Sequence, residues 1–241
     1  QVWYPITVCT QGREMKKTIM KYLTETGCGD VIEKGDHLYK LHDFGVRGAS
    51  SLESAALGGS AHLVNFMSTD TLPATVLARE FYADTGVGLT AMPGNDHGVV
   101  TSWGREREAD AYRHLMEQFP RGSVVCVSDS YDICSCCEQI LGTELKTQVE
   151  HRKGTLVVRS DSGKLPAIVL QVLEKLGAKF GTTTTNTGHK KLPECLRVLQ
   201  SDGIDINTVD NILRAMKSGG WAADNLAFGS GGALLQKLHR D

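Results

Sequence analysis

Short apolar runs alternate with segments of helical spacing along this chain of 241 residues. The runs with the apolar, β-branched composition of strands are 4–8, 62–66, 123–127, 155–159, 196–200 and 226–228. The helical candidates that follow them are 13–22, 74–82, 131–141, 165–176, 207–216 and 233–241. The helical period is clearest in 165–176, where apolar residues recur every three to four positions. The pattern predicts an α/β fold.

The strands are short and apolar, as expected for a parallel sheet that is buried on both faces and covered by helices. Repeated βα units of this spacing fit either a closed barrel or an open, doubly wound sheet. The period alone does not separate the two. In both architectures, polar function collects in the loops after the carboxyl ends of the strands.

Those loops are unusually polar here. They are Ser68-Thr69-Asp70-Thr71, Ser128-Asp129-Ser130-Tyr131-Asp132, Arg159-Ser160-Asp161-Ser162-Gly163, Gln200-Ser201-Asp202-Gly203-Ile204-Asp205 and Gly229-Ser230-Gly231-Gly232. A single aspartate at such a place is usually a helix N-cap. Several aspartates at one edge of a sheet favour a site that handles hydroxyls, a metal-bound phosphate, or both.

The strongest local signal is Phe228-Gly229-Ser230-Gly231-Gly232-Ala233-Leu234-Leu235, a strand that ends in glycines before a helix. Unobstructed backbone N–H groups at such a junction predict an anion site, with Lys237 and Arg240 near one helix face. The alternative is a glycine-tightened turn beside two solvated cations. The spacing matches neither GxxxxGK[ST] nor GxGxxG.

Composition narrows the choice of partner and compartment. The net charge of -2 gives no electrostatic case for nucleic acid or an anionic membrane as partner, and no apolar run approaches the ~20 residues of a membrane span. Seven cysteines without a disulfide framework favour the cytoplasm. The cluster Cys134-Ser135-Cys136-Cys137 lies in an apolar segment, which favours buried or half-buried thiols over a metal site.

Two segments lack a clear period. Residues 85–101 are rich in glycine and are predicted to form a long loop of the kind used as a lid. Residues 179–191, with a run of threonines, are predicted to form an exposed loop.

A set of motifs, in this order along nearly the whole chain, resembles the nicotinamide phosphoribosyltransferase family. They are His42-Asp43-Phe44-Gly45-Val46-Arg47-Gly48, Ser68-Thr69-Asp70-Thr71, Ser128-Asp129-Ser130-Tyr131-Asp132, Arg159-Ser160-Asp161-Ser162-Gly163, Asp202-Gly203-Ile204-Asp205 and Phe228-Gly229-Ser230-Gly231-Gly232. The resemblance implies a TIM-like α/β barrel of the nicotinate/quinolinate phosphoribosyltransferase type. It also implies transfer of a phosphoribosyl group from 5-phosphoribosyl-1-pyrophosphate to nicotinamide, with Mg²⁺, ATP stimulation and a homodimer whose active sites lie at the interface.

The resemblance also assigns roles. Phe44 and Arg159 would hold the pyridine ring, and Asp70 would accept a hydrogen bond from the carboxamide while repelling nicotinate. Asp161 would bind the ribose hydroxyls, Asp129 would lie on the side of pyrophosphate and Mg²⁺, and no residue is assigned as a direct metal ligand. The residues expected around the 5′-phosphate region are Arg47, Asp161, Asp202, Gly203, Gly231, Gly232, Lys237 and Arg240.

His97 matches the histidine that the family phosphorylates from ATP, although its flanks, Asn95-Asp96 and Gly98, depart from the family pattern. The catalytic candidates are therefore His97, Asp129 and Asp161. The alternatives are a nicotinate phosphoribosyltransferase on the same barrel, a non-catalytic binding member of the fold, and an unrelated sugar-phosphate barrel enzyme. Because the chain begins with Gln1 and its last helix has no cap, we expect residues 1–241 to be one barrel core without its flanking segments.

Overall fold

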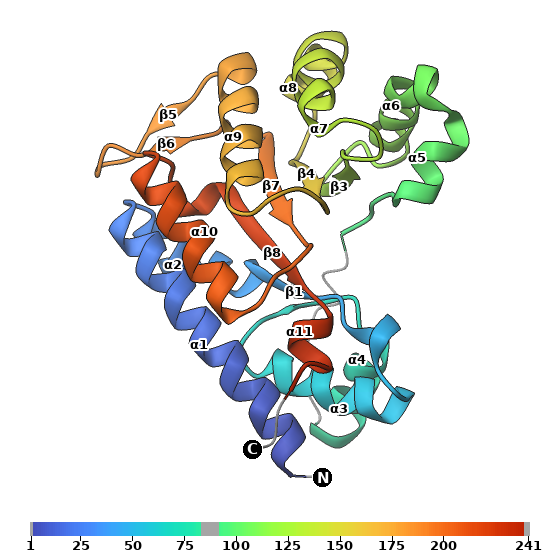
Figure 1. The fold of residues 1–241 in the computed structure, drawn as a ribbon, viewed down its shortest axis with the longest axis vertical. Helices are drawn as coiled ribbons and strands as arrows, with labels where there is room; N and C mark the ends of the chain where they lie inside the picture. Colours follow the sequence, from blue (N-terminus) through green and yellow to red (C-terminus); the bar gives the residue numbers. More distant parts are fainter. Residues whose placement is uncertain (1, 83–91, 239–241) are drawn as a thin grey trace.

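The computed structural model describes residues 2–82 and 92–238, and its centre is a sheet of parallel strands (Figure 1). The order across the six-stranded sheet is β2-β1-β8-β7-β4-β3. The strands are β1 (Leu41–Asp43), β2 (Ser68–Thr69), β3 (Val124–Val127), β4 (Leu156–Ser160), β7 (Leu196–Gln200) and β8 (Leu226–Ser230). A separate antiparallel hairpin joins β5 (Thr183–Thr184) to β6 (Lys190–Lys191).

Helices connect the strands. The α-helices are α1 (Trp3–Glu25), α2 (Gly29–Glu33), α3 (Leu52–Leu63), α4 (Leu72–Tyr82), α5 (His97–Trp103), α6 (Glu108–Gln118), α7 (Ile133–Ser135), α8 (Lys146–His151), α9 (Ala167–Phe180), α10 (Ile206–Ser218) and α11 (Gly232–Leu235). A π-helical segment, Cys136–Glu144, continues α7, and short 3₁₀ turns span Asp36–Tyr39, Val46–Gly48, Arg105–Arg107 and Ala223–Asn225. No helix among the described residues is both long and apolar enough to cross a membrane.

The two faces of the sheet are buried in different ways. Alternate residues of β3 and β4, such as Val124 and Leu156, join the main core with the helices. The opposite side chains, Val125, Val157 and Leu199, form a second, smaller cluster with Phe44, Met92 and Ala227. Residues of this second cluster also line the two cavities described below.

The first segment is helical, and the prediction of a strand at 4–8 is wrong. Helix α1 begins at Trp3 and runs to Glu25 along one side of the molecule, beside α10 (Figure 1). Its buried residues Val8, Met15, Ile19 and Tyr22 recur at helical spacing. Pro5 lies in the first turn, where the missing N–H costs no helical hydrogen bond.

The run 62–66 is also not a strand, because it contains the end of α3. The strand lies slightly later in the sequence, as β2. The sequence analysis missed β1 at Leu41–Asp43, because three residues are too few to show an alternation of apolar and polar positions. The closing helix is shorter than the predicted 233–241: α11 ends at Leu235. Residues 97–101 of the predicted lid belong to α5, and residues 83–91 lie outside the described part of the chain.

The remaining predicted strands and helices are present with small shifts at their ends. Strands occur within or beside 123–127, 155–159, 196–200 and 226–228, and helices within or beside 74–82, 131–141, 165–176 and 207–216. In the cysteine cluster, Cys136 and Cys137 are buried and Cys134 is half-buried, so the prediction of buried or half-buried thiols is confirmed. Burial raises the pKa of Cys136 and Cys137, and likewise that of Cys126 in β3. In the predicted loop 179–191, the first two residues end α9 and the rest forms the hairpin, in which β5 is exposed and β6 is half-buried.

Candidate functional site

A cavity of about 350 Å³ lies over the carboxyl ends of the four neighbouring strands β1, β8, β7 and β4. The residues predicted for the pyridine, ribose and phosphate that line it are Phe44, Arg47, Arg159, Asp161, Asp202, Gly203, Gly231, Gly232 and Lys237. They come from segments that are almost two hundred residues apart in sequence, and parallel pairing brings their strand ends to one edge. We call this the carboxyl-end cavity.

Phe44 follows β1 and lies beside β8. Its N–H donates to the carbonyl of Ser230 at 2.9 Å. A Cβ atom at Gly229 would stand 2.3 Å from Cε2 of Phe44, so only glycine leaves room for the ring. The guanidinium carbon of Arg159 lies 5.2 Å from the centre of the same ring. The structure therefore brings together the aromatic and the cation predicted for the pyridine pocket.

Arg159 and Asp161 project from the end of β4 and are joined by hydrogen bonds. Arg159 Nη2 donates to Asp161 Oδ2 at 3.1 Å. The hydroxyl of Ser201, at the end of β7, accepts from Arg159 Nε at 2.8 Å and donates to Asp161 Oδ1 at 2.6 Å. The side chains of Arg159 and Asp161 are 18% and 20% exposed, so both can still meet a ligand.

The other side of the cavity combines two cations with glycine backbone. Arg47 and Lys237 are both exposed and line this side, with Gly231 and Gly232 between them. Because α11 has only four residues and ends before Lys237, the predicted helix face that would carry Lys237 and Arg240 does not form. Arg240 itself lies outside the described residues.

Asp202 and Gly203 form the lip of the cavity after β7. Both are exposed, and Gly203 has a φ of 66°, a left-handed conformation that favours glycine. The next aspartate in this loop, Asp205, is a helix cap: its carboxylate accepts from the N–H groups of Asn207 and Thr208 in α10. The loop thus contains one aspartate that fits the functional interpretation and one that has the ordinary capping role.

His97 and Asp129 form a pair beside this cavity, next to β3. His97 begins α5, which Asp96 caps, and its Nε2 lies 2.9 Å from Asp129 Oδ1. The side chain of Asp129 is 2% exposed. Its Oδ2 accepts from the N–H of Asp161 at 2.8 Å and from the hydroxyl of Ser162 at 2.6 Å. Hydrogen bonds therefore connect all three catalytic candidates.

Asp70 follows β2, the edge strand on the other side of the sheet from β3. It does not line the carboxyl-end cavity. Its N–H donates to the carbonyl of Asp43 at 2.9 Å. Partial desolvation and the charge of Asp43 raise the pKa of the Asp70 carboxyl, while Arg159 acts to lower it. Asp70 is therefore within reach of the charge of Arg159, although β2 is not one of the four strands under the cavity.

Several residues of this edge were missed by the sequence analysis. Ser201 and Ser162 hold Arg159, Asp161 and Asp129, and Gln236 donates from Nε2 to the carbonyl of Gly45 at 2.8 Å. The signal for the serines was their place in the loops after β7 and β4. The contact of Gln236 left no signal, because it joins positions 191 residues apart.

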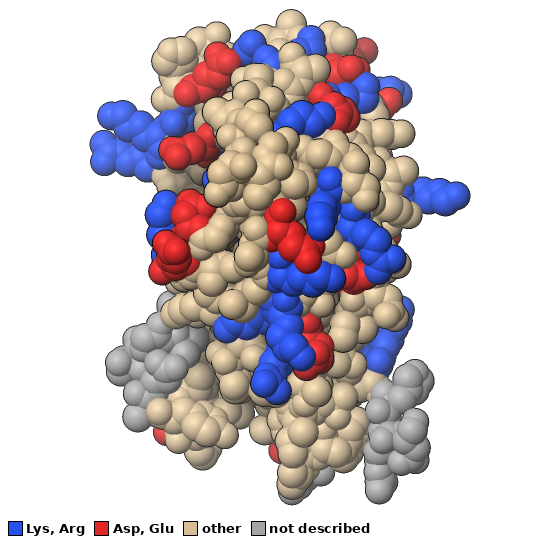
Figure 2. Space-filling view, turned by 90° about the vertical axis from the view of Figure 1, so that its left-hand side faces the viewer, with Lys and Arg blue, Asp and Glu red and all other residues tan. Residues whose placement is uncertain are grey.

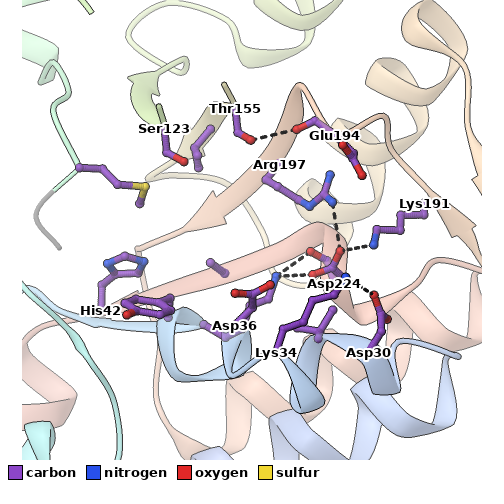
Figure 3. A pocket seen from close by; sticks show the side chains of 16 residues that line it. Asp30, Lys34, Asp36, His42, Ser123, Thr155, Lys191, Glu194, Arg197 and Asp224 are labelled. Atoms are coloured by element: carbon purple, nitrogen blue, oxygen red, sulfur yellow. Dashed lines mark hydrogen bonds and ion pairs between the residues drawn. The ribbon is translucent and has the colours of Figure 1, made fainter. Parts of the chain in front are cut away.

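A second cavity, of about 540 Å³, opens at the amino end of the same sheet (Figure 3). Its centre is Asp224, which receives Lys40 Nζ at 2.9 Å, Lys191 Nζ at 2.7 Å and Arg197 Nη2 at 3.1 Å. Burial alone would raise the pKa of Asp224, but the three cations together hold it well below its usual range. None of the predicted site residues that the structure describes lines this amino-end cavity.

The described residues contain no group of three or more His, Cys, Asp or Glu side chains arranged to hold a metal ion. The carboxylate oxygens of Asp129 and Asp161 are already hydrogen-bonded to protein donors. A divalent cation at this edge would therefore need ligands from a bound phosphate as well.

Comparisons with known proteins show relatives that match along the whole chain. A protein named nicotinamide phosphoribosyltransferase from Xanthomonas campestris pv. campestris is 47% identical over 243 residues, covering 100% of this chain and 51% of its own length. A protein of the same name from Mycoplasma pneumoniae is 30% identical over 253 residues, covering 100% of this chain and 52% of its own. The chain spans about half the length of the curated relatives it matches.

Solved structures show the same fold at low identity. Nicotinate-nucleotide pyrophosphorylase from Pyrococcus furiosus has a TM-score of 0.54 at 15% identity, over 93% of this chain and 47% of that one. A putative nicotinate phosphoribosyltransferase from Saccharomyces cerevisiae has a TM-score of 0.55 at 14% identity, over 94% and 49%. The predicted barrel type is thus confirmed, with six parallel strands that form half of a barrel. The model of the nicotinate phosphoribosyltransferase (NAPRTase) family matches residues 39–241, and the chain belongs to that family.

Proposed function

We propose that this chain carries the catalytic core that joins nicotinamide to 5-phosphoribosyl-1-pyrophosphate, giving nicotinamide mononucleotide and pyrophosphate for NAD salvage. One observation carries the proposal: a single cavity is lined by an aromatic ring, by a carboxylate, and by two cations beside glycine backbone. These are the groups needed for a pyridine, a ribose and a phosphate. The names of the relatives point to the same base.

The chemistry requires displacement at the anomeric carbon of the ribose. The pyridine nitrogen forms the new C–N bond while the C–O bond to pyrophosphate breaks, and that electron pair leaves with pyrophosphate. No covalent nucleophile is needed, so Phe44, Arg159 and Asp161 act by orientation, which supplies roughly 7–11 kcal/mol in favourable cases. Mg²⁺ brought in with the pyrophosphate would supply positive charge that offsets the negative charge of the leaving group.

His97 is proposed as the acceptor of a phosphoryl group from ATP. If Nε2–H donates to Asp129, the lone pair on Nδ1 remains available to attack the γ-phosphorus, with ADP as the leaving group. The ring is 44% exposed at the edge of the site. His97→Asn should abolish the stimulation by ATP and the acid-labile phosphate on the protein while leaving basal transfer measurable.

A homodimer in the cytoplasm is proposed as the working form. All seven cysteines are free, as expected in a reducing compartment. Basic and acidic side chains are interspersed on the face in Figure 2, whose lower end is mostly uncharged. Exposed apolar residues lie on α1 and α4 and directly after α3: Trp3 (41%), Ile6 (56%), Val64 (71%), Phe81 (75%) and Tyr82 (74%). A surface of this kind favours contact with another protein surface.

The test is a product assay on the protein expressed from its complete reading frame. With 5-phosphoribosyl-1-pyrophosphate and Mg²⁺, we expect nicotinamide to be converted to its mononucleotide much faster than nicotinate. The alternative, a nicotinate phosphoribosyltransferase, also fits the family and would reverse this preference. A protein that converts neither base, with or without ATP, would contradict both.

A further inference from the structure

The hydroxyl of Ser201 lies between the two charged groups of the carboxyl-end cavity. It accepts from Arg159 Nε at 2.8 Å and donates to Asp161 Oδ1 at 2.6 Å, while Arg159 Nη2 and Asp161 Oδ2 are 3.1 Å apart. These three bonds form a closed ring. A serine hydroxyl is suited to this place because it can accept from a cation and donate to a carboxylate at the same time.

The backbone sets the position of Ser201 firmly. Its N–H donates to the carbonyl of Ser160 at 3.1 Å, which continues the pairing of β7 with β4 beyond the end of the strand. A Cβ atom on Gly229 would lie 3.1 Å from Cβ of Ser201 and 2.3 Å from the ring of Phe44. The missing side chain at Gly229 thus leaves room for both Ser201 and Phe44.

The hydrogen bond to Nε has a particular effect on Arg159. With the link to Asp161 alone, a partly exposed guanidinium can still turn about its long side chain. A second bond at Nε restricts that rotation and fixes the plane of the group relative to Phe44, 5.2 Å away. Among the described residues, the two N–H groups of Nη1 have no protein partner and remain available to a ligand.

We propose that Ser201 is a positioning residue, which holds the Arg159 guanidinium against Phe44 and Asp161 and so preforms the part of the cavity that receives the pyridine and its ribose. The proposal rests on the proposed function for its kinetic effect. Its structural content, the placement of Arg159, does not depend on which base is the substrate.

The kinetic test compares Ser201→Ala with Ser201→Thr in the protein expressed from its complete reading frame. Loss of a hydrogen bond to a charged group predicts that Ser201→Ala raises KM for nicotinamide about tenfold. We expect kcat to change by less than about twofold, since the reacting atoms are untouched. Ser201→Thr, which keeps the hydroxyl, should restore most of the loss, and Ser218→Ala, at the end of α10, should match the wild type in both constants.

The structural test is a crystal structure of Ser201→Ala beside one of the wild type. We expect the guanidinium of Arg159 to leave its position against Phe44 in the variant alone. An unmoved guanidinium would overturn the proposal even where the enzyme is active, and so would unchanged kinetics in an active Ser201→Ala enzyme. A wild type that is inactive with nicotinamide while Arg159 moves as expected would instead overturn the proposed function.

Discussion

The two ends of one sheet hold two charged cavities, and they differ in whether their charges are already satisfied. At the amino end, both oxygens of Asp224 are bound by Lys40, Lys191 and Arg197, and the carboxylate is nearly inaccessible. At the carboxyl end, Arg159 and Asp161 are fixed but remain open to solvent. The larger cavity is therefore not the better candidate for catalysis, because function needs groups that are held in place and still free to bind.

The comparison predicts that the amino-end cluster contributes mainly to stability. Asp224→Asn would leave three cations close together without their common carboxylate, at a cost of about 3–5 kcal/mol in unfolding free energy. Urea unfolding checks this. The control is Asp30→Asn in the same cavity, whose exposed pair with Lys34 is worth at most about 1 kcal/mol. Equal, small losses in the two variants would remove the distinction between the two cavities.

The next effect is a loss of stability in acid from His42, which lines the amino-end cavity. Burial, helped by His62 and Lys40, lowers the pKa of His42 to about 4. The unfolded chain has an ordinary histidine with a pKa near 6.5, so it binds the proton first as the pH falls. Stability is therefore full above pH 6.5 and falls by about 3 kcal/mol as the pH drops toward 4.

Unfolding measured from pH 7.5 to pH 4.5 checks this effect of His42. His42→Gln should flatten the dependence on pH, whereas His151→Gln, at an exposed position in α8, should leave the wild-type slope. An undiminished slope in His42→Gln would assign the acid sensitivity to other groups.

At the carboxyl end, the predicted effects are on substrates. Asp70→Ala should lower kcat/KM for nicotinamide about ten- to a hundredfold, because a hydrogen bond from the carboxamide to a charged acceptor is lost. The advantage of nicotinamide over nicotinate should narrow. Steady-state kinetics with each base checks this. Unchanged discrimination between nicotinamide and nicotinate would place Asp70 outside the site, a result that would fit the position of β2 at the edge of the sheet, next to the four strands under the cavity.

The smallest predicted effect separates the two substrates. Arg47→Ala should raise KM for 5-phosphoribosyl-1-pyrophosphate about tenfold, since a cation near the phosphate is removed, and leave KM for nicotinamide nearly unchanged. Lys34→Ala removes a cation from the amino-end cavity and should change neither constant. Parallel losses for both substrates in Arg47→Ala would mean that the loop after β1 has moved.

The sequence predicted the edge of the sheet at which the site lies, because parallel strands bring their carboxyl ends together whatever their order. It failed where long-range contacts decide the local structure. Residues 4–8 resemble a strand in composition, but they are the start of the long helix α1, which packs against α3 and α10. The last helix ends early where Gln236 turns to bond the carbonyl of Gly45.

Within the site, residue types were easier to predict than contacts. Phe44, Arg159 and the glycines of 229–232 carry a recognisable pattern, and the structure brings them together. The hydrogen bonds of Ser201 and Ser162 depend on which strands are neighbours in the sheet. The order β8-β7-β4-β3 cannot be predicted from the local pattern of apolar and polar residues. The role of Asp96 as the N-cap of α5 could have been predicted from the sequence, since an aspartate before a helix is a common N-cap.

The most direct test of the central claim is a crystal structure of the protein, expressed from its complete reading frame, with nicotinamide mononucleotide. We predict that the pyridine lies against Phe44 and Arg159 and that the ribose meets Asp161. The 5′-phosphate should lie within hydrogen-bonding distance of Arg47, Lys237 or the N–H groups of Gly231 and Gly232. A nucleotide bound among Lys40, Lys191 and Arg197 at the other end of the sheet, with the carboxyl-end cavity empty, would contradict the account.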